Sequence, residues 1–201
     1  ELFLCFAGDL LCTSEVENTI PLLKSAYGDR FHKVLHVGPS ACSVVSRLMR
    51  MENTDAWGVE PYDIEDADFI CRRLVHRGLV RVSDIKFALP YRAKSFPLVV
   101  VSDALDYLSP KYLNRTLPDL ARVSSQGLVI FTGYPRHHQQ RKTVDKAKHG
   151  RSAKSRSRTW WNRYFEQMGL EENESVSKKF EEGAGKNSYT PKCQIFHLKP
   201  Y

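Results

Sequence analysis

The sequence lacks any long apolar run. No stretch reaches the roughly 18 consecutive apolar residues that a membrane-spanning helix requires, and the apolar segment at residues 2–7 is too short to cross a bilayer. The chain also begins at Glu1 rather than at a methionine. We therefore expect a fragment of a longer protein, whose targeting or anchoring segment precedes Glu1.

The cysteines and histidines lack the spacing of a metal site. The cysteines form no CxxC pair and no Cys/His cluster, which argues against structural zinc. His137 and His138 are adjacent, but no cysteine or carboxylate lies close to them, so we favour a solvated loop and predict no metal. An odd number of cysteines leaves at least one thiol unpaired within the chain, and the pairing cannot be assigned. The five are Cys5, Cys12, Cys42, Cys71 and Cys193.

The composition is neither that of a disordered chain nor that of a repeat protein. Of the 201 residues, 42% are hydrophobic and 26% are charged, which is enough apolar material for a sizeable core. There is no internal repeat, and we predict one globular domain over residues 1–201. N-glycosylation sequons begin at Asn114 and Asn173; chance sequons are common, so they favour a secretory compartment only mildly.

The excess of positive charge is confined to one segment. Residues 136–158 contain nine of the 30 Lys and Arg residues and one of the 23 Asp and Glu residues, so the rest of the chain has a net charge of −1. Such a run is ordinarily a solvated or nucleic-acid-binding stretch, although an acidic polysaccharide also presents a regular row of anions. We predict a polar loop or a partly helical insertion.

Strands and helices alternate along the first two thirds of the chain. A first helix starts at a Ser14–Glu17 capping box, or near Thr19 with Pro21 in its first turn. Further helices are predicted at residues 43–51, 64–76 and 110–123. Besides a strand that ends at Glu60, apolar strands are predicted at residues 33–37, 79–82, 97–101 and 128–132. This alternation predicts an α/β fold with a Rossmann-like, doubly wound, mostly parallel sheet.

The last third departs from this alternation. Thr159 is expected to cap a helix that extends to Met168. Strands are predicted at residues 170–180 and 192–199, with a connection at 183–186. Two late strands joined by a loop predict an antiparallel hairpin at one edge of a sheet of about seven strands.

One strand–turn–helix unit has the layout of a cofactor site. The strand at residues 33–37 breaks at Gly38 into a helix, and Glu60 ends the next strand about 20 residues later. Backbone N–H groups of such a turn can face a ligand, and a carboxylate can accept hydrogen bonds from both hydroxyls of a ribose. The turn lacks the second and third glycines of a full fingerprint, so an ordinary connection is the alternative.

Polar residues stand at the ends of four successive predicted strands. The carboxyl ends of parallel strands form the ligand-binding edge of an open α/β sheet, so we expect these residues at one site. They are His36 and Gly38, then Glu60, then Asp84 with Ile85, and finally Ser102 with Asp103.

Two blocks resemble class I S-adenosylmethionine-dependent methyltransferases. LPYRAKSFPLVVVSDALDYL, at residues 89–108, is similar to the segment around the fourth strand of that superfamily, and LARVSSQGLVIF is similar to its fifth-strand block. Other blocks closely resemble a plant family, the cotton-Golgi-related pectin methyltransferases. These blocks are VLHVGP, AWGVEPYDIEDAD, LVRVSDIKFALPYRAKSF, VSDALDYLSPKYLN and CQIFHLKP.

The resemblance implies a carboxyl O-methyltransferase that uses S-adenosyl-L-methionine. Its substrate would be the galacturonic acid carboxylates of homogalacturonan, the acidic polysaccharide of pectin. It would be a type II membrane protein of the Golgi apparatus, with its anchor upstream of Glu1 and its catalytic domain in the lumen. Complexes with other pectin-synthesis enzymes are compatible with this expectation, and no nucleic-acid partner is expected.

The resemblance also implies where the cofactor binds. Gly38 would lie under the methionine part, Glu60 would hold the ribose hydroxyls, and Asp84 with Ile85 would flank the adenine. His36 departs from the superfamily pattern, because an acidic residue usually stands there and helps to bind the methionyl amine. The full expected set is His36, Gly38, Ser40, Glu60, Pro61, Asp84, Ile85, Ser102 and Asp103.

The implied chemistry needs no general base. A uronic acid has a pKa of roughly 3 to 4, so its carboxylate is already an anionic nucleophile near neutral pH. Ser102 and Asp103, expected near the methionyl amine and the reacting methyl group, are the catalytic candidates, and Asp103 would act by positioning. We do not expect His137 or His138 to be an essential base.

Acceptor binding is expected in the basic segment and the adjoining tryptophans. Its cations would attract a polyanion, and one tryptophan would pack in the core while the other offers its ring to a sugar. The candidate residues are Arg136, Arg151, Lys154, Arg156, Arg158, Trp160 and Trp161.

Two alternatives stay open. An RNA methyltransferase would also use the basic segment, but the sequence has no RNA-binding module and no NPPY-type motif. A non-catalytic or partner-dependent scaffold is compatible with His36 and with the missing glycines of the turn.

Overall fold

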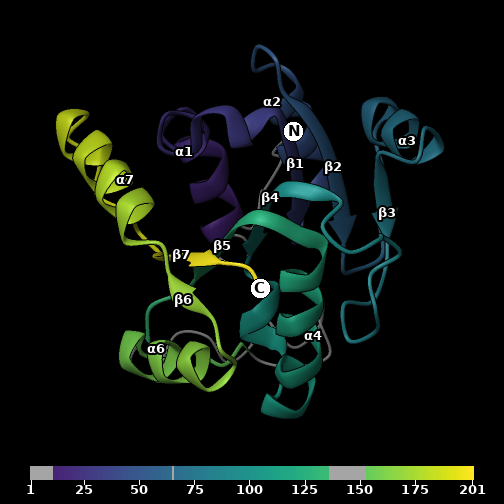
Figure 1. Ribbon diagram of the computed structural model, residues 1–201. Helices are drawn as coiled ribbons and strands as arrows, with labels where there is room; N and C mark the ends of the chain where they lie inside the picture. Colours follow the sequence, from purple (N-terminus) through teal and green to yellow (C-terminus); the bar gives the residue numbers. More distant parts are fainter. Residues whose placement is uncertain (1–10, 65, 136–152) are drawn as a thin grey trace.

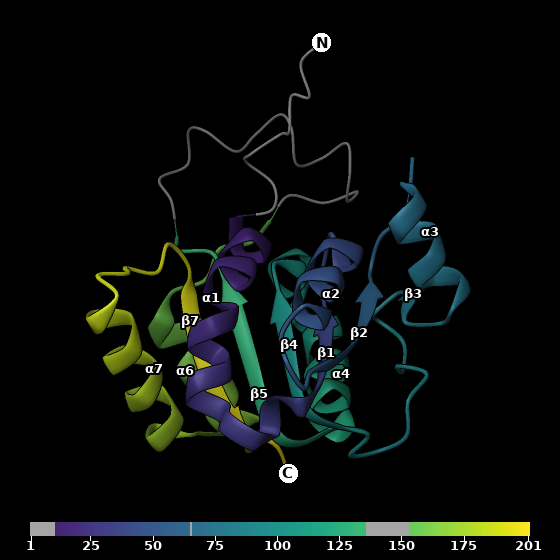
Figure 2. The same cartoon turned by 90° about the horizontal axis from the view of Figure 1, so that it is seen from above.

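The computed structural model describes residues 11–64, 66–135 and 153–201. Within these residues a seven-stranded sheet lies between layers of helices (Figures 1 and 2). The order across the sheet is β3-β2-β1-β4-β5-β7-β6. The strands are β1 (Lys33–Val37), β2 (Asp55–Glu60), β3 (Val80–Val82), β4 (Phe96–Ser102), β5 (Ser124–Thr132), β6 (Glu171–Glu172) and β7 (Gln194–Lys199).

The first five strands are parallel, and β7 is antiparallel to both of its neighbours, β5 and β6. The predicted doubly wound, mostly parallel sheet with an antiparallel edge is therefore confirmed.

Helices cover both faces of the sheet. They are α1 (Leu11–Tyr27), α2 (Ala41–Met49), α3 (Phe69–His76), α4 (Pro110–Val123), α6 (Arg158–Gln167) and α7 (Glu174–Lys186), with short 3-10 turns at Gly28–His32 and Ala104–Tyr107. In the described part of the chain, no helix is long and apolar enough to cross a membrane.

Alternate strand residues enter two separate hydrophobic cores, as the period of a strand requires. In β4, Val99 and Val101 pack with residues of α4 and α6, whereas Leu98 and Val100 pack with residues of α1, α2, α3 and α7. The central strands are buried on both faces, which explains why the sequence of β4 is almost wholly apolar.

Helix α1 begins earlier than predicted. It starts at Leu11, so both the Ser14–Glu17 capping box and the start near Thr19 are wrong. Glu17 instead forms a salt bridge with Arg47 of α2, at 3.2 Å. The cap of α1 comes from a distant part of the chain and is described with the site below.

Helix α3 begins later than predicted. The prediction started it at residue 64, whereas the helix begins at Phe69. Asp68 is its N-cap and accepts a hydrogen bond from the Cys71 N–H at 2.7 Å. The acidic residues before Asp68 therefore precede the helix rather than occupy its first turn.

The predicted strand at residues 170–180 is wrong. Only Glu171–Glu172 pairs with β7, and α7 follows at once, so residues 183–186 belong to a helix and not to a connection. Asn173 caps α7 by accepting a hydrogen bond from the Val176 N–H at 3.3 Å. Helical spacing explains the outcome, because one side of α7 is buried through Val176, Phe180 and Ala184.

Two disulfides join elements that are far apart in the sequence. Cys12 of α1 is bonded to Cys193, which precedes β7, across 181 residues. Cys42 of α2 is bonded to Cys71 of α3, across 29 residues. The sequence alone left these pairings unassigned, and Cys5 lies outside the described residues.

We expect loss of the Cys12–Cys193 bond to destabilise the fold. A disulfide that closes a long loop restricts the unfolded chain, and its removal typically costs about 2–5 kcal/mol. The double variant Cys12→Ser, Cys193→Ser should lower the free energy of unfolding measured by urea denaturation. The matched variant Cys42→Ser, Cys71→Ser opens a shorter loop and should cost less. Parental stability in the first variant would contradict this assignment.

Candidate active site

The ends of the parallel strands gather at one edge of the sheet. The arrows of β1, β2, β4 and β5 point to the same side (Figure 2). Val37 of β1 is the register partner of Val59 in β2 and of Val101 in β4. The residues that follow these three are therefore neighbours: Gly38, Glu60 and Ser102. The structure brings these predicted site residues together.

Gly38 is required by the close approach of β1 to β4. A Cβ atom at this position would lie 2.5 Å from the Ser102 carbonyl oxygen and 2.7 Å from the Ser102 hydroxyl oxygen, closer than real Cβ atoms approach their neighbours. The Gly38 N–H also donates to the Val59 carbonyl at 3.1 Å. Any side chain here would force the two strands apart.

Glu60 closes the turn against the start of α2. Its side chain is buried, and Oε2 accepts a hydrogen bond from the Ala41 N–H at 3.0 Å. Ala41 is the first residue of α2, where a negative charge is favourable. Ser40, just before it, supplies no side-chain cap and has a positive φ of 54°. Ser40 thus adopts the left-handed backbone conformation that glycine adopts most readily.

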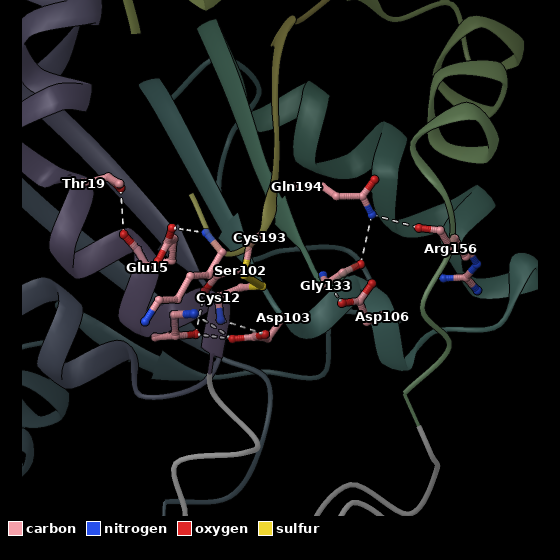
Figure 3. Close-up of a disulfide and its surroundings, with 12 residues drawn as sticks. Cys12, Glu15, Thr19, Ser102, Asp103, Asp106, Gly133, Arg156, Cys193 and Gln194 are labelled. Carbon is pink, nitrogen blue, oxygen red and sulfur yellow. Dashed lines mark hydrogen bonds between the residues drawn. A yellow bond between two sulfur atoms is a disulfide. The ribbon is translucent and has the colours of Figure 1, made fainter. Parts of the chain in front are cut away.

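Asp103 ends β4 and caps helix α1. Its carboxylate accepts hydrogen bonds from the Cys12 N–H at 3.3 Å, from the Thr13 N–H at 2.8 Å and from the Thr13 hydroxyl at 2.8 Å (Figure 3). Its φ of 60° is unusual for a residue other than glycine. Such backbone conformations persist where the surrounding contacts fix them, and they concentrate at functional sites.

A chain of hydrogen bonds leads from Asp103 back to His36. The Thr13 hydroxyl lies 2.7 Å from the Ser102 hydroxyl, which lies 2.9 Å from His36 Nε2. Because Thr13 donates its one hydroxyl proton to Asp103, Ser102 must donate to Thr13, and His36 must donate from Nε2 to Ser102. The connectivity therefore assigns the tautomer of His36 that carries its proton on Nε2.

His36 and Ser102 lie beneath the edge rather than on it. Both are 0% exposed. Burial lowers the pKa of His36 to about 3, so the imidazole is neutral near neutral pH. Its Nδ1 has no hydrogen-bond partner among the described residues. His36 and Ser102 are therefore linked to Asp103 through Thr13, and their side chains are not exposed at the surface of the edge.

Three residues at the edge were missed from the sequence: Tyr62, Asp106 and Tyr107. The rings of Tyr62 and Tyr107 pack edge to face, with centroids 6.3 Å apart. Burial raises the pKa of Tyr62, and so do, in decreasing order, the nearby acidic groups of Tyr107, Asp103, Glu60 and Asp106. The edge therefore combines the carboxylates of Glu60 and Asp103 with two tyrosine rings, while the buried Asp106 carboxylate accepts a hydrogen bond from the Gly133 N–H at 2.9 Å. Tyr62, Asp106 and Tyr107 follow strand ends closely, which is the signal that could have found them.

The residues that follow β3 lie at the margin of the candidate site. The Ser83 N–H donates to the Glu60 carbonyl at 3.0 Å, which places Asp84 one strand beyond Glu60. Asp84 is exposed and forms a salt bridge with Lys86 at 3.4 Å. Ile85 is buried. Pro61, which follows Glu60, is half-buried.

Arg156 is a buried anchor and not a free cation. It is 9% exposed, and its guanidinium donates to the Leu108 carbonyl at 2.7 Å and, more weakly, to the Leu105 carbonyl at 3.4 Å. The guanidinium also lies 4.7 Å from the ring centroid of Trp160. These contacts hold the start of α6 against the turn after β4, so we no longer assign Arg156 to acceptor binding.

The two tryptophans differ in burial. Trp161 is 0% exposed and stacks with Phe165, so it packs in the core as expected for one of the pair. Trp160 is half-buried and stacks on Tyr164, with centroids 5.1 Å apart. Only Trp160 therefore has ring surface that a sugar could contact.

The rest of the basic segment is described in part. Lys154 and Arg158 are exposed, and the Arg158 guanidinium lies 4.7 Å from the ring centroid of Phe196. The predictions for Arg136 and Arg151, and for His137 and His138, lie outside the described residues.

A groove of about 900 Å³ lies away from this edge, between α6, β6 and α7. Leu198 and Lys199, which line it, end β7. Because β7 is antiparallel to β5 and its first residue, Gln194, pairs with Thr132, the end of β7 points away from the candidate edge. Glutamates line part of the groove. Among the described residues, however, no three His, Cys, Asp or Glu side chains are grouped to hold a metal ion.

The strand order and the antiparallel β7 define the fold. An S-adenosylmethionine-dependent methyltransferase from Aquifex aeolicus superposes with a TM-score of 0.60 at 14% identity, covering 96% of this chain and 95% of that one. One from Mesorhizobium loti gives 0.56 at 13% identity, covering 90% and 97%. The chain has the fold of the class I S-adenosylmethionine-dependent methyltransferases.

Sequence similarity then narrows the class to a family. Two proteins of Arabidopsis thaliana, named "Probable pectin methylesterase CGR3" and "Probable pectin methylesterase CGR2", are each 64% identical to this chain over 193 residues. Each alignment covers 96% of this chain and 74% of the relative. The chain belongs to this family, the cotton-Golgi-related proteins. No protein-family profile matches the chain.

We expect the fold to lose stability in mild acid. Burial lowers the pKa of His36 to about 3, and burial together with the Arg158 charge lowers that of His197 to about 4, both from 6.5. Below pH 6.5 the unfolded chain therefore binds protons that the folded chain excludes. Each histidine should cost about 2 kcal/mol at pH 5. Urea denaturation at pH 7, 6 and 5 measures this loss.

The variant His197→Gln is the matched control, because glutamine can retain the hydrogen bond that the His197 ring makes with the Tyr27 hydroxyl at 2.8 Å. It should weaken the dependence of the unfolding free energy on pH. An unfolding free energy that stays constant between pH 7 and 5 in the parent chain would show that these histidines are not buried in the neutral form.

Proposed function

We propose that the chain is a methyltransferase that uses S-adenosyl-L-methionine to methyl-esterify galacturonic acid carboxylates of homogalacturonan. The observation that carries this proposal is the position of Glu60, whose buried carboxylate lies at the start of α2 and beside Gly38, within a fold of this class. The names of the two Arabidopsis relatives refer to pectin, which supports a pectic acceptor.

The residues at the edge fit this cofactor chemically. S-adenosyl-L-methionine carries a sulfonium and an ammonium cation, and both carboxylates and aromatic faces attract cations. The carboxylates of Asp103, Glu60 and Asp106 each raise the pKa of Tyr62, so their negative charge is felt at this ring. A carboxylate accepts several hydrogen bonds, so Glu60 can cap α2 and also hold ribose hydroxyls. Asp84 and Ile85 would flank the adenine.

The missing glycines of the turn do not argue against binding. Gly38 occupies the position where a side chain cannot fit, and Ser40 adopts the positive φ that the turn needs. The turn thus reaches a positive φ and a close approach of two strands without the other two glycines. This observation favours an enzyme over the scaffold alternative.

Methyl transfer to a carboxylate requires no general base from the protein. The acceptor is ionised well above its pKa of roughly 3 to 4, and the bound cofactor would supply the activated methyl group. The chain has to hold one carboxylate oxygen in line with the methyl carbon, at about 3–3.5 Å, and to exclude water. Asp103 is suited to positioning, because α1 and the end of β4 hold its carboxylate in place.

Ester hydrolysis is the second candidate, because the relatives are named methylesterases and Ser102 lies 2.9 Å from His36. A serine nucleophile must donate its proton to the histidine. Here the Ser102 proton is committed to Thr13, and Ser102 is 0% exposed. The hydrogen bond between Ser102 and His36 therefore runs in the wrong direction for a serine nucleophile, and the pair has no access to a substrate. We favour methyl transfer over ester hydrolysis.

We further propose that the domain works in the Golgi lumen, with a membrane anchor upstream of Glu1. The chain spans 74% of the length of the relatives, which leaves room for such a segment in the whole protein. The Cys12–Cys193 and Cys42–Cys71 bonds are typical of oxidising compartments. An RNA substrate is not expected in such an oxidising compartment.

The direct test supplies methyl-labelled S-adenosyl-L-methionine with polygalacturonate and, separately, methyl-esterified pectin without cofactor. We expect label in the polymer as a base-labile ester, and no methanol released from the pectin. Methanol release without label transfer would instead establish the hydrolase.

Glu60→Ala should weaken binding of S-adenosylhomocysteine about tenfold or more, measured by calorimetry. Hydrogen bonds to a charged group contribute roughly 1.5–3 kcal/mol each in favourable cases, and two are lost. Glu60→Gln keeps an acceptor for the Ala41 N–H and separates loss of the cap from loss of the charge. Exposed Glu182 provides the control variant, Glu182→Ala. Unchanged affinity in folded Glu60→Ala would remove Glu60 from the cofactor site.

A further inference from the structure

Helix α3 presents a cationic face to solvent. Its buried side consists of Cys71 and Leu74, which are 8% and 6% exposed. The residues spaced around the opposite side are exposed. Two apolar residues stand at the start of the helix, and basic residues follow them. We call them the α3 face: Phe69, Ile70, Arg72, Arg73, His76 and Arg77.

The arginines of the α3 face form no salt bridge within the described residues, although the exposed carboxylates of Asp63, Asp66 and Asp68 precede the helix. None of the four salt bridges there involves Arg72, Arg73 or Arg77. The Arg73 guanidinium lies over the ring of Phe69, 5.6 Å from its centroid. Unpaired cations gathered on one face attract anionic ligands.

The apolar side chains of the α3 face are unusually exposed. Phe69 is 67% exposed and Ile70 is 55% exposed. Large apolar groups left in water beside charges are typical of interaction surfaces. A polymer of uronic acids suits this combination, because each sugar carries a carboxylate for an arginine and a C–H face for an aromatic ring.

The α3 face is held beside the candidate active site. The Cys42–Cys71 bond fastens α3 to the first turn of α2, next to the turn that follows β1. Helix α3 starts on the side to which the strands point (Figure 2). Strands β4 and β3 are three strand spacings apart, which is about 15 Å. A polymer bound on α3 can therefore extend to Asp103.

The carboxylates at the edge favour the cofactor over the acceptor. Glu60 and Asp103 attract a cation and repel a polyanion. Exposed cations, such as Lys154 and the arginines of α3, would have to supply the attraction for the acceptor.

We propose that the α3 face is a second binding subsite for the polyuronate acceptor, which holds a part of the chain remote from the carboxylate being methylated. This inference rests on the proposed function for the identity of the acceptor. A helix of eight residues with one exposed phenylalanine is short for a membrane-surface anchor, and the disulfides favour a compartment without RNA.

The test compares two triple variants that remove the same charge from opposite edges of the sheet. Arg72→Gln, Arg73→Gln, Arg77→Gln alters the α3 face, and Lys178→Gln, Lys179→Gln, Lys186→Gln alters exposed residues of α7. Affinity electrophoresis in polygalacturonate, without cofactor, should show about five- to tenfold weaker binding for the α3 variant alone at low ionic strength. Added salt should remove most of that difference.

Methyl transfer provides the second readout. The α3 variant should need more polygalacturonate for half-maximal rate, while its rate with a galacturonic acid trimer, too short to span both sites, should match the parent. Because electrophoresis needs no turnover, a parent chain that binds the polymer through α3 but transfers no methyl group would refute the proposed function and leave the subsite standing.

Three outcomes would overturn the subsite. In the first, the α3 variant would bind polygalacturonate as tightly as the parent does. In the second, both triple variants would lose affinity equally, which would show that only the net charge matters. In the third, the α3 face binds RNA or vesicles containing anionic lipid but not polygalacturonate.

Discussion

The buried carboxylate of Asp103 is the contact on which the rest of the edge depends. It follows the central strand β4, accepts hydrogen bonds from the Cys12 and Thr13 N–H groups at the start of α1, and terminates the hydrogen-bond chain that begins at His36. Because α1 is also bonded to Cys193 beside β7, Asp103 links the parallel half of the sheet to its antiparallel half. The φ of 60° at Asp103 is the conformational cost of this arrangement.

Charge is divided between the regions of this structure in a way that suits two ligands of opposite sign. Carboxylates and tyrosines occupy the edge, where a sulfonium would lie, while a neutral polar layer of His36, Ser102 and Thr13 supports them from below. The exposed arginines of α3 stand outside, on a helix that the Cys42–Cys71 bond holds in place. A cationic cofactor and an anionic acceptor can therefore be attracted to adjacent places without competing for the same side chains.

Local patterns in the sequence predicted what local physics determines. The break of the first strand at Gly38 and the apolar run of β4 were sufficient to predict the parallel sheet. They also predicted that Gly38, Glu60 and Ser102 lie at one edge of it. The errors arose where a distant residue decides the outcome. Asp103 caps α1 from 90 residues away, which a local capping motif cannot reveal. Arg156 can be buried because the carbonyl oxygens of Leu105 and Leu108 accept hydrogen bonds from its guanidinium. In α7, the glycines within the helix concealed the spacing of Val176, Phe180 and Ala184.

Hydrogen exchange followed by mass spectrometry, with and without S-adenosylhomocysteine, tests most directly whether this edge is the cofactor site. The account predicts slower exchange in the turn at residues 38–42, at the end of β2 and in the segment after β4, together with the first turn of α1, because Asp103 couples α1 to β4. Exchange in α7 should not change. Protection confined to the groove between α6, β6 and α7, or no protection at saturating ligand, would contradict the account.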